Sequence, residues 1–269
     1  IFDEYPNWGD GDGCTVQTIM PEIYAWIDAR GNHPSLICFD IMNEGGGTLP
    51  SDIIPLGRSY DLQQRPWDNG WRSPVGENDS IECHPYIMGG QGISGLQSHD
   101  NTKPLVTTAD IGWTAEQYAG HAFILNEHGE LWIDRNGQAM SGTAGFWNQI
   151  LPNATNEERL TYYAEAMAAE IECFRAGRAY AGMLFFCGLT SSPAGAVGIT
   201  CDILSPDVST PASLQIRPYT KELLTHAFSP LGICLDEYTE DVRRGQTLTL
   251  PVVLINDTGE AVEDLTVTL

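Results

Sequence analysis

The stretch NHPSLICFDIMNEGG, residues 32–46, places an amide, a carboxylate and glycines at the end of an apolar run. Six of the eight residues from Leu36 to Asn43 are apolar, which is typical of a strand covered on both faces in a parallel α/β sheet. Parallel α/β folds bind their ligands at the carboxyl ends of such strands. Asn43 and Glu44 are therefore the first candidates for a functional site.

A second apolar run ends in the same way. Residues 121–132 read HAFILNEHGELW, and their first part predicts a buried strand. Asn126 and Glu127 end this strand, again with a glycine within two residues. In a barrel of parallel strands both glutamates would lie at one opening. Two facing carboxylates are what glycoside hydrolysis requires, at a separation of about 5–5.5 Å in retaining enzymes and about 6.5–9.5 Å in inverting ones.

Strands and helices alternate along most of the chain, which predicts an α/β fold with a parallel sheet. Thr155 to Glu158 fits a capping box at the start of a helix, and apolar residues recur at helical spacing from 160 to 174. From about residue 229 the pattern changes to alternating apolar and polar residues around a turn signal at 256–259, which suits the start of a β-sandwich. The other segments predicted are strands at 1–4, 80–88 and 181–189, a short strand within 65–71, and helices at 21–30, 53–61 and 218–228.

The composition argues against several classes of partner. The 269 residues include 36 acidic and 13 basic side chains, a formal charge of −23, which disfavours binding to nucleic acid or to an anionic membrane. The seven cysteines show no Cys-x-x-Cys pair and no Cys/His spacing suited to zinc. We therefore expect a carbohydrate or another neutral substrate, no cofactor and no metal.

The motifs resemble those of family 2 glycoside hydrolases of clan A, the family of β-galactosidases and β-glucuronidases. In that family Asn-His-Pro-Ser precedes the fourth barrel strand and Asn-Glu ends it, as in residues 32–44. ILNEHG at 124–129 is similar to the end of strand seven, HPYI at 84–87 to the tip of strand six, and IFDEYPNWG at 1–9 to the end of strand three. The resemblance covers most of residues 1–230, with the motifs in the family's order.

The resemblance implies a role for each matching residue. Glu44 would be the acid/base and Glu127 the nucleophile of a retaining exo-β-glycosidase, and Asn43 would hydrogen-bond the sugar 2-hydroxyl. For His84 and Tyr86 the alternative is packing at the barrel mouth, and tryptophan is as often a core residue as a sugar platform. The substrate-binding candidates are Asn43, His84, Tyr86 and Asn126, with Trp67, Trp71 and Trp132 as stacking platforms.

The resemblance also implies a domain organisation. Residues 1–228 would be the C-terminal five or six β/α units of a TIM-type barrel, and residues 229–269 the beginning of an immunoglobulin-like sandwich. Because eight strands close such a barrel, we expect missing N-terminal segments or a neighbouring chain to complete it, and the 269 residues alone to be inactive. Strand eight departs from the clan, since Phe185, Phe186 and Cys187 stand where a tryptophan is usual.

Two alternatives stay open at this point. A non-catalytic carbohydrate-binding relative would keep the same cleft, and an inverting or transglycosylating enzyme would use the same scaffold.

Overall fold

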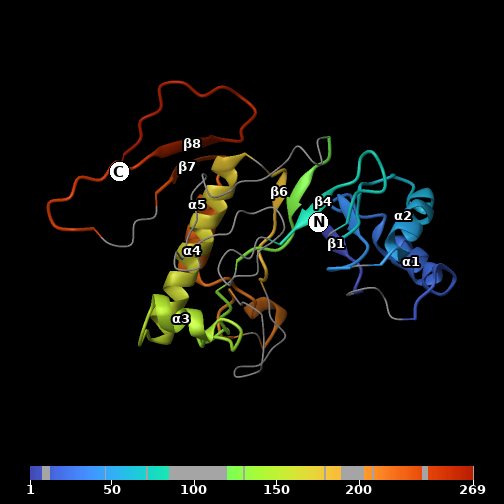
Figure 1. The fold of residues 1–269 in the computed structure, drawn as a ribbon, viewed down its shortest axis with the longest axis horizontal. Coiled ribbons are helices and arrows are strands. Elements are labelled where there is room, and N and C mark those ends of the chain that lie inside the picture. Colours follow the sequence, from blue (N-terminus) through green and yellow to red (C-terminus); the bar gives the residue numbers. More distant parts are fainter. Residues whose placement is uncertain are drawn as a thin grey trace. The chain divides into compact units, whose positions relative to one another are not determined.

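The chain folds as two compact units, Ile1–Cys83 with Ala115–Asn126, and His84–Thr114 with Glu127–Leu269 (Figure 1). Trp71 and Tyr86 lie outside the residues described. The computed structural model describes residues 1–7, 13–45, 47–70, 72–84, 120–129, 131–178, 180–188, 203–207, 209–237 and 242–268.

The described residues of the first unit include five short parallel strands. β1 (Phe2–Glu4), β2 (Cys38–Asp40) and β3 (Trp67–Asp68) pair in chain order, and β4 (Ile81–Cys83) pairs with β5 (Phe123–Leu125). The backbone N–H of Ser80 donates to the carbonyl of Trp67 at 3.1 Å, which connects the start of β4 to β3. The predicted parallel α/β arrangement is confirmed, although these five strands do not by themselves close a barrel.

Two helices supply the core of this unit. α1 (Val16–Arg30) packs on α2 (Leu49–Tyr60), and their apolar faces meet β2 and β3. α1 begins five residues earlier than predicted, because the side chain of Thr15 caps the N–H of Thr18 and Pro21 falls inside the helix. The core residues shared by these elements are Ile19, Met20, Ile23, Ile27, Leu36, Phe39, Ile41, Met42, Ile53, Ile54 and Trp67.

The second unit is dominated by α4 (Asn156–Gly177), which begins where the capping box predicted. The N–H of Glu158 donates to the hydroxyl of Thr155 at 3.3 Å, and the N–H of Thr155 donates back to the Glu158 carboxylate at 2.7 Å. The apolar residues predicted for one face of this helix are buried, namely Leu160, Tyr163, Ala164, Met167, Ile171 and Phe174. The remaining elements up to residue 227 are α3 (Ala144–Ile150), β6 (Gly182–Met183), η2 (Pro211–Ser213) and α5 (Pro218–Ala227).

The C-terminal strands pair differently from the prediction. β8 (Val252–Asn256) pairs antiparallel with β7 (Leu231–Leu235), whereas the turn signal at 256–259 predicted a hairpin with the residues that follow it. Described residues 260–268 form no strand. β7 and β8 pack on α4 (Figure 1), and this two-stranded sheet does not by itself show a sandwich.

A group of hydrogen bonds holds β8 to α4. The Arg175 guanidinium donates to the carboxylate of Asp257 at 2.8 Å and to the carbonyl of Ser229 at 2.6 Å. Arg178 donates to the other oxygen of Asp257 and to the carbonyl of Asn256.

Among the described helices, none has both the length and the apolar character needed to cross a bilayer.

Candidate active site

Glu44 lies just beyond β2, in a backbone conformation that fixes its direction. Its φ is +51°, in the left-handed region that non-glycine residues rarely adopt. The next residue, Gly45, is buried, and a Cβ there would lie 2.0 Å from Sδ of Met42. The turn that carries Glu44 is therefore packed tightly against the core, and the glutamate itself is half-buried.

Asn43 joins this turn to the end of the neighbouring strand. Its backbone N–H donates to the carbonyl of Asn7 at 2.8 Å, beyond β1. Its side-chain oxygen Oδ1 is buried and accepts no hydrogen bond, and a buried amide oxygen of this kind is normally satisfied by a ligand or by water. This amide and the Glu44 carboxylate thus lie beyond the carboxyl end of β2, although the strand itself ends at Asp40, earlier than the sequence predicted.

Glu127 follows β5 and is paired with a histidine. It is 8% exposed, and a carboxylate oxygen lies 3.3 Å from Nδ1 of His84, which is 1% exposed. The structure brings these two predicted residues together from positions 43 residues apart in the chain, since His84 follows β4 and β4 pairs with β5. Glu44 belongs to the first unit, and Glu127 and His84 belong to the second.

Asn126 contacts an acidic residue that the sequence analysis did not single out. Its side-chain Nδ2 donates to a carboxylate oxygen of Glu82 on β4. Asn126 was predicted to bind substrate, and in the structure its amide nitrogen is engaged with this neighbouring strand. Its Oδ1 is buried without a hydrogen-bond partner.

Two of the three tryptophans predicted as stacking platforms are among the described residues, and one of these predictions needs a correction. Trp67 is fully buried in the core of the first unit, where its ring centroid lies 5.0 Å from that of Phe39. A side chain in this position packs the core and offers no face to a sugar, so the prediction of a stacking platform at Trp67 is not supported. Trp132 is half-buried in the second unit and remains a candidate.

Several ionisable residues on the strands were missed. In the first unit, Glu4 at the end of β1 is exposed overall, but partial desolvation of its carboxyl and then the charge of Glu44 raise its pKa. Burial raises the pKa of Asp68 to about 7, and burial together with Asp68 and Glu4 raises that of Asp40. The sequence did contain a signal, namely the acidic residues within or at the end of apolar strands. Burying a charged carboxylate costs free energy unless a partner neutralises it, so such residues point to a site.

The second unit holds a further histidine–carboxylate pair. Nδ1 of His128 lies 3.4 Å from an oxygen of Glu170 on α4, and the imidazole packs edge-on against Phe174. His128 directly follows Glu127, and its carbonyl accepts a hydrogen bond from the N–H of Phe186 at 2.8 Å. This pair anchors the backbone next to Glu127 to α4 and to the segment after β6.

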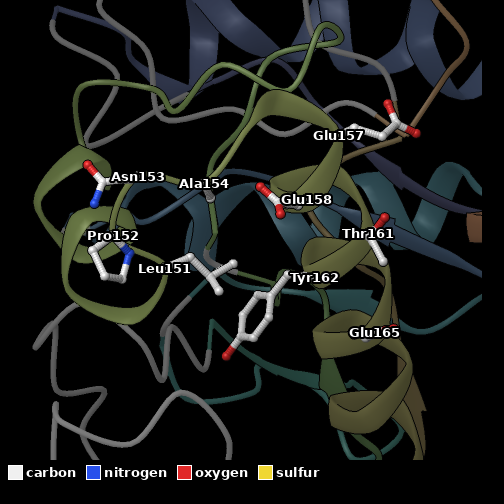
Figure 2. A pocket seen from close by; sticks show the side chains of 9 residues that line it. All are labelled: Leu151, Pro152, Asn153, Ala154, Glu157, Glu158, Thr161, Tyr162 and Glu165. Atoms are coloured by element: carbon white, nitrogen blue, oxygen red, sulfur yellow. The ribbon is translucent and has the colours of Figure 1, made fainter.

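A pocket of about 440 Å³ lies beside the first turns of α4, away from these residues in the chain (Figure 2). Leu151, Pro152 and Tyr162 contribute apolar surface, and Glu157, Glu158 and Glu165 contribute carboxylates. None of its nine lining residues is a predicted site residue. The strand-end motifs therefore did not predict this pocket.

Comparison with known proteins shows a similar fold in solved structures, but no matching protein family. No protein-family model matches the sequence, and no curated protein matches it. Solved structures do match. A β-D-mannosidase from Dictyoglomus thermophilum has a TM-score of 0.55 at 13% identity, over 96% of this chain and 34% of that one.

A β-glucuronidase from Ruminococcus gnavus, in complex with D-glucaro-d-lactam, also has a TM-score of 0.55, at 15% identity, over 84% of this chain and 39% of that one. The same enzyme with an N1-substituted uronic isofagomine has a TM-score of 0.52 at 14% identity. The chain thus spans between a third and two fifths of the length of these two enzymes. Its fold is similar to that of part of a glycoside hydrolase.

Proposed function

We propose that this chain is part of the catalytic barrel of a retaining, exo-acting β-glycosidase. Its five described parallel strands would belong to the part of an eight-stranded barrel that residues 1–228 supply, and residues 229–269 would begin an immunoglobulin-like domain. The fold similarity to a β-mannosidase and a β-glucuronidase carries the proposal. The strand pairing in chain order supports it, because consecutive parallel neighbours are typical of barrels.

The proposed mechanism is a double displacement. The Glu127 carboxylate attacks the anomeric carbon and forms a glycosyl ester, while the Glu44 carboxyl gives its proton to the departing glycosidic oxygen. Glu44 then takes a proton from water, and the resulting hydroxide breaks the ester. The anomeric configuration is retained because two inversions occur.

The surroundings of the two glutamates fit these roles. The buried position of Glu127 excludes most water from its carboxylate, and the imidazole of His84 restricts its orientation. Asn43 adjoins Glu44 and has an amide oxygen without a partner, which suits a hydrogen bond from a sugar hydroxyl. Asn126, Tyr86 and Trp132 complete the proposed substrate site.

The test is a panel of aryl β-glycosides assayed with the intact protein that contains this chain. Mannoside and glucuronide come first, because of the two structural neighbours, with galactoside and glucosaminide beside them. We expect turnover of one sugar class, with retention observed by proton NMR. Glu127→Gln should abolish turnover, and Glu165→Gln on the exposed surface of α4 should keep it.

A 2-deoxy-2-fluoro glycoside of the active class identifies the nucleophile. We expect mass spectrometry to find the label on Glu127. A label on Glu44, or inverted product, would refute the assigned roles. Binding of the sugar without turnover of any of the four glycosides would favour the carbohydrate-binding alternative instead.

A further inference from the structure

Three acidic side chains converge in the first unit, below the strand ends. Asp40 on β2 lies directly opposite Asp68 on β3 in the parallel register, so both side chains leave the same face of the sheet. Glu82 on β4 joins them, and one carboxylate oxygen from each residue lies within 4.8 Å of the other two. The three residues are 0%, 0% and 3% exposed.

The donors around this cluster satisfy it only in part. Ser80 Oγ donates to Oδ2 of Asp68 at 2.6 Å, and the N–H of Met42 donates to Oδ1 of Asp40 at 3.3 Å. Oδ2 of Asp40 and Oδ1 of Asp68 are buried and accept no hydrogen bond. Within the described part of the chain, neither aspartate forms an ion pair with a basic side chain.

The side chain of Asn126 contacts one of the three carboxylates. Its amide nitrogen donates to Glu82, and its amide oxygen is buried without a hydrogen-bond partner. Because this amide is neutral, its unmet acceptor does not result from the acidic charges. An amide oxygen is also a ligand that hard cations accept.

Burying three carboxylates together is unfavourable unless their charge is neutralised. Protons can do this, or a cation can. Each added proton supplies one O–H donor, which can serve one of the buried unpartnered oxygens of Asp40 and Asp68. A single cation can contact several such oxygens at once.

We propose that Asp40, Asp68 and Glu82 bind one hard divalent cation of the Ca²⁺, Mg²⁺ or Mn²⁺ type in the core of the first unit. All the ligand atoms are oxygens, which favours these ions over Zn²⁺ or Cu²⁺. Because Ca²⁺ holds its ligands at about 2.3–2.6 Å, two ligand oxygens of one ion lie at most about 5 Å apart. The observed spacing satisfies that limit.

The ion would be structural and would not depend on the proposed glycosidase chemistry. It would tie β2, β3 and β4 together through their side chains, in a unit whose strands are only two or three residues long. Ligands that bind only the folded state raise the melting temperature in proportion to the logarithm of their excess concentration. Metal content and thermal stability therefore test the site without an activity assay.

The experiment uses the intact protein, treated with EDTA and then dialysed against CaCl₂, MgCl₂ or MnCl₂ in parallel. We expect about one ion per chain by mass spectrometry of the metal, and a melting temperature that rises with the concentration of that ion. Asp68→Asn and Glu82→Gln should each lose the ion and the rise. In EDTA we expect Asp68→Asn to be at least as stable as the wild type, because it removes a buried charge.

Asp52→Asn is the matched control, since Asp52 lies exposed on α2 of the same unit. It makes the same chemical change and should keep both the ion and the rise in melting temperature. Wild-type protein that retains none of the three ions, with a melting temperature unaffected by them, would overturn the proposal and assign the neutralising charge to protons. Asp68→Asn that binds metal as the wild type does would overturn it too.

Discussion

Nδ1 of His84 lies 3.3 Å from a carboxylate oxygen of Glu127, and both side chains are buried. The two residues follow neighbouring parallel strands, β4 and β5, so the contact is set by strand pairing. A carboxylate held in this way has few orientations open to it. This matters for a nucleophile, whose attack depends on alignment with the anomeric carbon.

His84→Ala is therefore expected to slow formation of the glycosyl-enzyme by about 100-fold, the cost of a misplaced reacting group. The rate of labelling by the 2-fluoro glycoside measures this step directly. The melting temperature of the variant serves as the check on folding. An unchanged labelling rate in a folded variant would mean that His84 only packs the strand ends.

Glu44→Ala should affect substrates according to their leaving groups. Aryl glycosides with good leaving groups need no protonation in the first step, so their cleavage should be slowed less than that of poor ones. Azide can enter the space left by the carboxylate and should restore part of the turnover. Equal losses for both substrate classes, without rescue by azide, would contradict the acid/base role.

Gly45→Ala should disturb the turn that carries Glu44. The new Cβ would collide with Sδ and Cε of Met42, so this fully buried side chain would have to repack. We expect a loss of about 1–3 kcal/mol, the usual cost of overpacking. Urea denaturation of Gly45→Ala, Met42→Ala and the double variant tests the collision, because the double variant should be more stable than the sum of the single effects predicts. If the two single changes in unfolding free energy simply add in the double variant, the predicted collision between residue 45 and Met42 does not occur.

Thr155→Ala should destabilise the protein by about 1 kcal/mol, because it removes the side-chain cap of α4. Thr155→Ser keeps the hydroxyl and should stay close to the wild type. Chemical denaturation of the three proteins gives the comparison. Equal losses in both variants would show that the threonine methyl group, and not the hydroxyl, stabilises this helix start.

The pKa of Glu4 is raised above its ordinary value of 4.5 by burial and by Glu44. The folded protein thus holds this proton more tightly than the unfolded chain, so the stabilising contribution of Glu4 is fully present below pH 4.5 and is lost as pH rises through the folded pKa. Glu4→Gln cannot ionise and should raise the melting temperature more at pH 8 than at pH 4. Asp52→Asn controls for the lost charge. A shift of equal size at both pH values would contradict the effect of Glu4.

The sequence predicted the features that depend on neighbouring residues. The start of α4 followed from Thr155 and Glu158, which are three residues apart, and the parallel strands followed from their apolar runs. The positions of Asn43 and Glu44 after β2 followed from one continuous motif. In each case the interaction that decides the structure is local.

Features that depend on distant residues were missed. The burial of Trp67 arises from its packing on Gly57 of α2, where an added Cβ would lie 2.6 Å from the indole. β8 pairs with β7, some twenty residues earlier, instead of with the segment after its own turn. The contact between Glu82 and Asn126 joins residues 44 apart. Such contacts depend on which strands pair and in which register, and the residue pattern of a single sequence does not specify this.

The hydrogen bonds of Arg175 have a consequence for how the second unit opens. The guanidinium of Arg175, on the last turn of α4, holds the end of α5, the turn before β7 and the residue after β8. These elements can separate only if all of its bonds break together. Amide hydrogens in α4, α5 and the β7–β8 pair should therefore exchange with solvent at a common rate, as a single cooperative block.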